Sequence, residues 1–286
     1  MRFLDVRTDF AFKKVFGSEG SKDVLLSFLN AVLYHDSPRK LTDVTIVDPY
    51  SIPLLKGMKD TYVDVKAKLD DGSGVIIEMQ VLNHPGFEKR ILYNAAKHYS
   101  VQLQKGEDYT LLNPVVALTI VDFPLFDDTD AILTRFRLLE KESLIEYSGD
   151  IELVFIELPK FRKSEQELTD IRDKWIFFVK NAGSLEYIPT NMDAELRKAF
   201  EIANEANLSQ AELEAQHKRR EFILIQKSAL AGAEQRGIEQ GIQQGLQQGI
   251  QQGIQQVARN MLLAGVSPET IAQTTGLSRA ELDNLL

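Results

Sequence analysis

The chain has 286 residues and a net charge of −9, and 44% of its residues are hydrophobic and 26% charged, as in an ordinary globular protein of one large or two small domains. It contains no cysteine, which excludes a disulfide scaffold, a thiol nucleophile and a cysteine-ligated zinc site. The acidic net charge argues against a protein that coats nucleic acid indiscriminately.

The charge and the apolar segments also bear on location and partners. The N-terminal stretch MRFLDVRTDFAFKKVF is charged and lacks the apolar segment of a secretory signal, and no apolar run reaches the length of a transmembrane helix. We therefore expect a cytoplasmic protein of bacterial type without a membrane partner. Basic and acidic residues balance within residues 1–110, so that part can present a neutral or locally basic surface.

Apolar periodicity predicts an alternation of helices and strands along the chain. The expected elements of the first part are two helices in residues 9–34, a strand in 41–54, a hairpin in 61–80 with the turn DDGSG, a helix in 86–105 and a strand in 114–126. Two strand-like runs, FRLLEKESLIEY and IELVFIELP, follow in residues 134–158, and then comes a helix in 165–182 that holds the only tryptophan. From about residue 193 the pattern is helical and charged. We expect a first domain in 1–190, a long helical region in 191–256 and a small helical segment in 257–286.

The long helical region ends in a repeat, GIEQGIQQGLQQGIQQGIQQ, at residues 237–256. Glycine recurs every four residues, so the apolar stripe drifts by about 40° per repeat on an α-helix, and each glycine costs roughly 1 kcal/mol against alanine. Such a helix needs a partner, most simply a second copy of the chain. The other interpretation is a flexible spacer that arose by repeat expansion.

The final segment has clear helix punctuation. Ser267 and Pro268 predict the N-cap and the first residue of a helix, and Gly276 predicts the C-terminal end of that helix. Ser278 and Glu281 predict a capping box at the start of the next helix. The spacing superficially suggests a helix-turn-helix. The last helix, however, carries acidic residues where readers of the major groove usually carry Arg, Lys, Asn or Gln, which favours packing or partner binding over DNA reading.

The hairpin in 61–80 carries polar residues on one face. Alternation places Asp64, Lys66 and Lys68 on the same side of their strand, and Glu78 and Gln80 on the same side of the next. A turn centred near Gly72 would put Asp64 opposite Gln80 and Lys66 opposite Glu78. A register shifted by two residues would put Asp64 opposite Glu78 and keep the same face.

Two carboxylates at cross-strand distance repel each other unless a cation lies between them or one holds a proton. Mg²⁺ would relieve the repulsion, lower the pKa of a bound water and polarise a phosphoryl oxygen, as phosphodiester hydrolysis requires. Lys66 would add positive charge, and Gln80 would orient the water. The alternative is a solvated hairpin face with Lys–Glu pairs.

Four stretches favour a metal-binding hairpin over a solvated one: TDFAFKKVFG, YVDVKAKLDDGSGVIIEMQ, EKRILYNAAKHYSVQLQKGEDY and PVVALTIVDF, within about residues 5–125. They resemble the Rpn family of recombination-promoting nucleases and transposases, within the PD-(D/E)XK nuclease superfamily. The resemblance implies an α/β fold with an αβββαβ core, in which helices flank a central mixed sheet, and an α-helical C-terminal extension. It also implies a DNA endonuclease that depends on Mg²⁺, or on Mn²⁺ or Ca²⁺ in its place, with a possible role in recombination or mobile-element DNA.

By position, Asp64 matches the strand acid of the family and Glu78 the acid of its E-x-K or E-x-Q pair, with Gln80 in place of the more widespread lysine. Asp9 matches the acid of the opening motif, as a metal ligand or as the N-cap of a helix that begins at Phe10. Lys66 is a candidate for the missing cation that the motif itself does not supply.

DNA binding is expected from the first part of the chain. Arg90 and Tyr93 match family positions one helical turn apart, and Arg90 could instead form a surface ion pair. Further candidates for phosphate contacts are Lys13, Lys14, Lys66, Lys68 and Lys89. Two other functions stay open: a non-catalytic DNA-binding or assembly protein whose site has decayed, and an interaction protein that works through a repeat tail forming homo-oligomers.

Overall fold

The computed structural model of the chain describes residues 1–51 and 61–285 and divides into two compact units, Met1–Ile223 and Leu224–Leu286. Residues 52–54 of the strand expected in 41–54 lie outside the described residues. The first unit extends beyond residue 190 because helix α5 (Ala194–Ile202) contributes buried residues to its main hydrophobic core.

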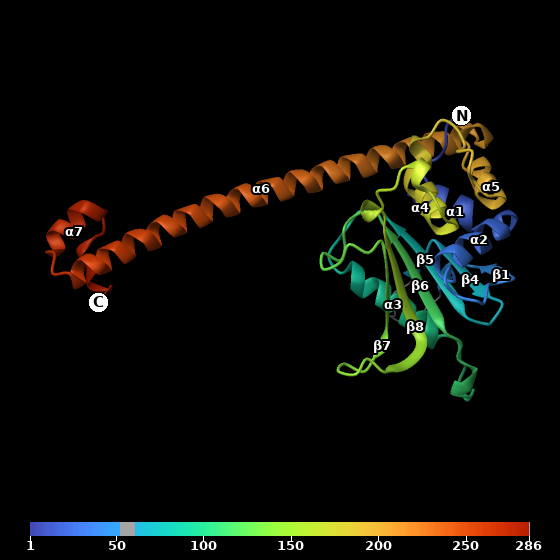
Figure 1. The fold of residues 1–286 in the computed structure, drawn as a ribbon, viewed down its shortest axis with the longest axis horizontal. Helices are drawn as coiled ribbons and strands as arrows, with labels where there is room; N and C mark the ends of the chain where they lie inside the picture. Colours follow the sequence, from blue (N-terminus) through green and yellow to red (C-terminus); the bar gives the residue numbers. More distant parts are fainter. Residues whose placement is uncertain (52–60, 286) are drawn as a thin grey trace. The chain divides into compact units, whose positions relative to one another are not determined.

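A six-stranded mixed sheet forms the centre of the first unit, in the order β1-β4-β5-β6-β8-β7 (Figure 1). The strands are β1 (Val44–Val47), β4 (Val65–Leu69), β5 (Gly74–Gln80), β6 (Val115–Val121), β7 (Leu133–Leu139) and β8 (Glu146–Glu157). Strands β5, β6 and β8 are parallel, and the other neighbours pair antiparallel. A separate ribbon joins β2 (Tyr50–Ser51) to β3 (Thr61–Tyr62). The predicted mixed α/β core is confirmed.

One face of the sheet packs on the main hydrophobic core. The helices that contribute to it are α1 (Asp9–Phe16), α2 (Lys22–Val32), α4 (Ile171–Asn181) and α5. Trp175 is fully buried there, and its ring centroid lies 5.7–5.9 Å from those of Phe16, Phe28 and Phe178. Such aromatic clusters contribute large buried areas to a core.

The other face is covered by helix α3 (Phe87–Ser100), which connects the parallel strands β5 and β6. A parallel pair requires such a crossover. Ile91 and Ala95 of the helix pack in one cluster with Ile76, Ala117 and Phe155 of the sheet. This helix passes next to the end of β5, where the polar residues of the hairpin lie.

The prediction of one strand in residues 136–147 is wrong, because these residues include the end of β7, a turn and the start of β8. Strand β7 ends at Leu139, Leu144 adopts a positive φ of 56°, and β8 begins at Glu146, which pairs with Leu139. The connecting residues 140–145 contain no Gly, Pro, Asn or Asp, and the single Ser143 is a weak turn signal.

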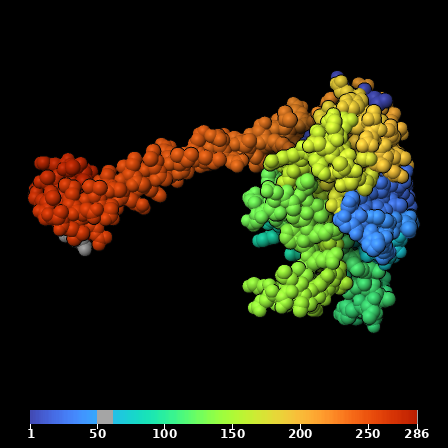
Figure 2. Space-filling model, viewed as in Figure 1, coloured from blue at the N-terminus to red at the C-terminus, as the bar shows by residue number. Residues whose placement is uncertain are grey.

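The C-terminal part is helical. Helix α6 (Gln210–Leu263) includes the whole repeat, and α7 (Pro268–Thr275) and α8 (Arg279–Asp283) follow (orange to red in Figure 2). The predicted caps are confirmed: Ser267 accepts from the backbone N–H of Thr270, Gly276 has a φ of 75°, and Ser278 forms a capping box with Glu281. Ala258, Ile271 and Leu282 form a small core of their own. In the described part of the chain, no helix combines the length and the apolar character needed to cross a membrane.

Candidate active site

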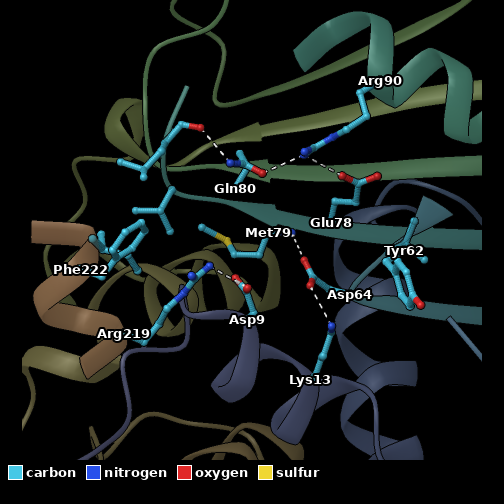
Figure 3. A pocket seen from close by; sticks show the side chains of 14 residues that line it. Asp9, Lys13, Tyr62, Asp64, Glu78, Met79, Gln80, Arg90, Arg219 and Phe222 are labelled. Atoms are coloured by element: carbon cyan, nitrogen blue, oxygen red, sulfur yellow. Dashed lines mark hydrogen bonds and ion pairs between the residues drawn. The ribbon is translucent and has the colours of Figure 1, made fainter. Parts of the chain in front are cut away.

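A cavity of about 360 Å³ lies at the end of strand β5, between helix α1 and an early turn of helix α6 (Figure 3). It is lined by Asp9, Lys13, Tyr62, Val63, Asp64, Glu78, Met79, Gln80, Val81, Leu82, Arg90, Arg219, Phe222 and Ile223. The cavity therefore gathers all three predicted acids, the predicted amide and two of the predicted cations.

Asp64 reaches the cavity because the chain bends just before β4. Val63 packs with the helix α3 cluster and Val65 with the main core, although strict alternation would place both on one face. One carboxylate oxygen of Asp64 accepts a hydrogen bond of 2.8 Å from the backbone N–H of Met79, and the other lies 3.6 Å from Lys13 Nζ. The bend thus turns an acid of the hairpin toward the end of β5.

The electrostatics of Asp64 reflect its surroundings. The pKa of Asp64 is raised to about 6, chiefly by burial; the carboxylates of Asp9 and Glu78 contribute to the rise, while the Met79 hydrogen bond and Lys13 act in the opposite direction. Repulsion from both other acids follows from their sharing one cavity. A cation bound among them would relieve that repulsion.

Glu78 is almost completely buried, with 7% of its surface exposed. Asn94 Nδ2 of helix α3 donates a hydrogen bond of 2.6 Å to one carboxylate oxygen, and Arg90 Nη2 lies 3.2 Å from the other. A buried carboxylate needs such paired donors, because its desolvation is otherwise costly. Helix α3 therefore fixes the orientation of Glu78 from above the sheet.

Gln80 is held at both ends of its amide. Its Oε1 accepts a hydrogen bond of 2.8 Å from Arg90 Nη2, and its Nε2 donates one of 2.8 Å to the carbonyl of Leu82. Arg90 therefore bridges Glu78 and Gln80, two residues apart on one face of β5 (Figure 3). The surface ion pair considered for Arg90 is replaced by this bridge within the cavity.

Asp9 does not cap its helix. Helix α1 begins at Asp9 itself, with Thr8 at the N-cap position, so the expected N-cap role for a helix starting at Phe10 is wrong. Instead Asp9 Oδ2 accepts a hydrogen bond of 2.8 Å from Arg219 Nη2. Lys13, one turn further along α1, also faces the cavity.

The register of the hairpin differs from the first of the two considered. Lys66 pairs with Ile76 and Val65 with Ile77, which extends to Asp64 opposite Glu78, the arrangement shifted by two residues. The reason lies in the turn: the backbone N–H of Leu69 donates to the carbonyl of Ser73, so the turn is centred on Asp71 and not on Gly72. The expected pairs Asp64–Gln80 and Lys66–Glu78 are therefore wrong.

Lys66 is outside the cavity. It is half-buried, and its charge acts on His98 of helix α3, where burial, and then Lys66, lower the histidine pKa to about 4. The positive charges next to the acids come from Lys13, Arg90 and Arg219 instead. The structure thus places the cation expected of Lys66 on other elements.

The remaining predicted DNA contacts lie outside the cavity. Lys14 pairs with Glu212 at 3.1 Å, and Lys68 is exposed on β4. Tyr93 is 38% exposed on α3, and Lys89 lines a separate apolar depression beside β7 and β8.

Three residues of the site escaped prediction. Asn94 lies one turn after Arg90 on helix α3, and that spacing was the available signal for it. Arg219 and Phe222 come from helix α6, more than 200 residues from Asp9, and no local pattern indicates that they meet α1.

The donor set fits a divalent cation with oxygen ligands. Asp64 and Glu78 present carboxylates to one cavity, and the Oδ1 atom of Asn94 is buried beside Glu78 without a hydrogen-bond partner among the described residues. Mg²⁺ is commonly held by only one or two carboxylates together with water and substrate phosphate. Among the described residues, no three His, Asp or Glu side chains already converge into a metal-binding group.

A mixed sheet flanked by helices, with a pair of acids and an amide at a strand end, defines a nuclease-like α/β core. Comparison with family models agrees: residues 6–233 match the model described as PD-(D/E)XK nuclease family transposase. The chain belongs to this family. No curated protein and no solved structure matches the chain.

The C-terminal residues 251–286 match a second model, described as Rpn/YhgA-like nuclease family, C-terminal HTH domain. The resemblance to Rpn nucleases is confirmed. The helix-turn-helix spacing noted for the last helices agrees with this match, and the packing or partner role favoured for them stays a prediction. Together the two matches indicate nuclease and DNA-binding activity.

Proposed function

We propose that the protein is a metal-dependent DNA endonuclease that hydrolyses phosphodiester bonds. The observation that carries the proposal is the convergence of Asp64, Glu78 and Gln80 in one cavity with Lys13 and Arg90. Acids that bind a cation and bases that bind phosphate are the two requirements of this reaction.

In this proposal Asp64 and Glu78 hold the metal ion, Mg²⁺ or in its place Mn²⁺ or Ca²⁺, and Asp9 is a further ligand once it is released from Arg219. The bound ion would supply an activated water and polarise the phosphoryl oxygen. Asn94 keeps the Glu78 carboxylate in place through its hydrogen bond of 2.6 Å. Burial, and then repulsion from Asp9 and Glu78, raises the pKa of Asp64, and a cation at this position would stabilise the ionised carboxylate against both effects.

The other side chains position the substrate in this proposal. Gln80, fixed by Leu82 and Arg90, orients the attacking water. Arg90 and Lys13 already lie at hydrogen-bond or ion-pair distance from the acids, and both are partly exposed, so they can turn to a phosphate. Lys66 has no place in this mechanism.

We further propose that the repeat of helix α6 forms homo-oligomers and that the physiological substrate is recombining or mobile-element DNA. Exposed apolar side chains recur along the repeat, at Ile238, Ile242, Leu246 and Ile250, and a Cβ added at any of its glycines would meet no atom within 4 Å. Isolated helices with such a surface are unstable in water. An assembly with two nuclease sites suits the cutting of both strands of a duplex.

Calorimetric titration with Mg²⁺ and Ca²⁺, followed by nicking of supercoiled plasmid, tests the proposed function. The expected result is saturable binding of both ions and nicking that requires Mg²⁺ or Mn²⁺. Nicking unchanged by EDTA would contradict a metal-dependent reaction.

A non-catalytic DNA-binding protein is the second candidate. One observation favours it: Asp9, Asp64 and Glu78 are each already paired with a basic side chain. Absence of heat on metal titration, combined with retained DNA binding, would decide for this candidate.

A further inference from the structure

Helix α6 is anchored along helix α1 by two polar contacts that precede the cavity. Lys14 Nζ lies 3.1 Å from Glu212, and the hydroxyl of Thr8 donates a hydrogen bond of 3.0 Å to Gln216 Oε1. Thr8 and Gln216 are both buried, with 1% and 5% of their surfaces exposed. These contacts hold the beginning of α6 against α1 without help from the next turn.

Arg219 lies on that next turn and points into the cavity (Figure 3). Its Nη2 donates a hydrogen bond of 2.8 Å to Asp9, and its guanidinium lies 5.7 Å from the ring centroid of Phe222. The Arg219 and Asp9 side chains are 44% and 50% exposed. An ion pair this exposed contributes little to stability, so Arg219 does little to anchor the helix and is available for another role.

The guanidinium has more donors than its partner takes up. Arginine carries five N–H donors in a planar fork that matches the oxygens of a phosphate, whereas the hydrogen bond to Asp9 uses one of them. Cation–π contact with Phe222 supports the fork from the side without using its donors. The exposed position next to the acids is where a phosphodiester would approach.

We propose that Arg219 is a phosphate-binding residue of the nuclease site, supplied by helix α6 and paired with Asp9 until DNA arrives. The inference rests on the proposed function, since it assigns the same cavity a third basic residue beside Lys13 and Arg90. Asp9 acts as a resting partner that competes with the phosphate for Arg219. The phosphate backbone of the substrate would thus contact Lys13 of α1, Arg90 of α3 and Arg219 of α6.

Binding of a fluorescent six-nucleotide single strand to the full chain in EDTA, over a series of salt concentrations, tests this assignment. A single strand offers no major groove to a helix-turn-helix domain, and EDTA prevents cleavage. Arg219→Gln should weaken binding about tenfold, because it removes charge-assisted hydrogen bonds to a phosphate, and should reduce the salt slope by about 0.7. Arg220→Gln removes the same charge from the adjacent exposed position and should change affinity less than about twofold.

The Asp9→Asn variant distinguishes two roles for Arg219, which are to contact phosphate and to anchor helix α6 on α1. If Arg219 binds phosphate, Asp9→Asn frees it and tightens binding by up to about fivefold, the equivalent of a surface ion pair, and Asp9→Asn with Arg219→Gln loses that gain. The proposal is overturned if Arg219→Gln and Arg220→Gln weaken binding equally, or if the double variant keeps the gain. It is overturned as well if Asp9→Asn weakens binding as much as Arg219→Gln does and both lower the melting temperature. The nuclease proposal is tested separately: it fails if the wild-type protein binds the strand but does not cut DNA when Mg²⁺ is present.

Discussion

Replacing Asp64 by asparagine should stabilise the protein at neutral pH in the absence of metal. Burial raises the pKa of Asp64 from 3.8 to about 6. Because the folded-state pKa lies above the unfolded value, the ionised carboxylate destabilises the fold: the penalty is absent below about pH 4 and is complete once the pH has risen past 6. About two pKa units correspond to about 3 kcal/mol at pH 7.5, which asparagine removes while still accepting the hydrogen bond from Met79.

Thermal melting in EDTA at pH 5 and pH 7.5 measures this effect. For a unit of this size, 3 kcal/mol corresponds to an increase of about 6–12 °C at pH 7.5, with a smaller increase at pH 5. Asp64→Ala should gain less, because the buried N–H of Met79 then loses its acceptor at a cost of about 1–3 kcal/mol. Asp43→Asn, at an exposed acid, is the matched control and should change little. An Asp64→Asn variant that melts at or below the wild-type temperature at pH 7.5 would refute the reasoning.

Three further predictions concern the surroundings of the site and the tail. Asn94→Ala should cost about 1–3 kcal/mol and lower nicking, because it removes a donor from buried Glu78; equal melting temperatures and equal nicking rates would contradict this. Burial and Lys66 lower the pKa of His98 to about 4, so the folded protein loses stability as pH falls from about 6.5 toward 4, where only the unfolded chain binds the proton. His98→Gln should therefore reduce the loss of unfolding free energy over this pH range by up to about 3 kcal/mol. His217→Gln, at an exposed position, should leave the pH dependence unchanged. Light scattering should give a multiple of the chain mass for the full chain and a single chain mass for residues 1–231, and two monomeric masses would exclude assembly through the repeat.

The order of helices and strands could be predicted because apolar spacing and turn residues are local signals. The caps at Ser267, Gly276 and Ser278 were predictable for the same reason, since each cap satisfies the backbone of its own helix. The turn before Glu146 was not, because Ser143 is its only turn-forming residue and one such residue is a weak signal.

The acidic side chains of the site could be predicted from the sequence, and its basic side chains only in part. Asp64 and Glu78 share a hairpin, and alternation predicted them on one face in either register with an even shift, whereas in the structure the bend before β4 turns Asp64 into the cavity. The register depends on where the turn is centred, and moving the centre by one residue, from Gly72 to Asp71, changes the partner of Lys66 from Glu78 to Ile76. Arg219 reaches the acids only through the packing of α6 on α1, which sequence spacing does not encode.

The most direct measurement of the central claim is nicking of supercoiled plasmid with Mg²⁺ by wild type, Asp64→Asn and Glu78→Gln. The controls are Asp43→Asn and Glu88→Gln, which remove the same charge at exposed positions outside the cavity. The account predicts that the controls nick at the wild-type rate while both site variants, still folded by their melting temperatures, lose nicking by at least about a hundredfold, as expected when a ligand of a catalytic metal is removed. A folded Asp64→Asn or Glu78→Gln protein that nicks as fast as wild type would contradict it.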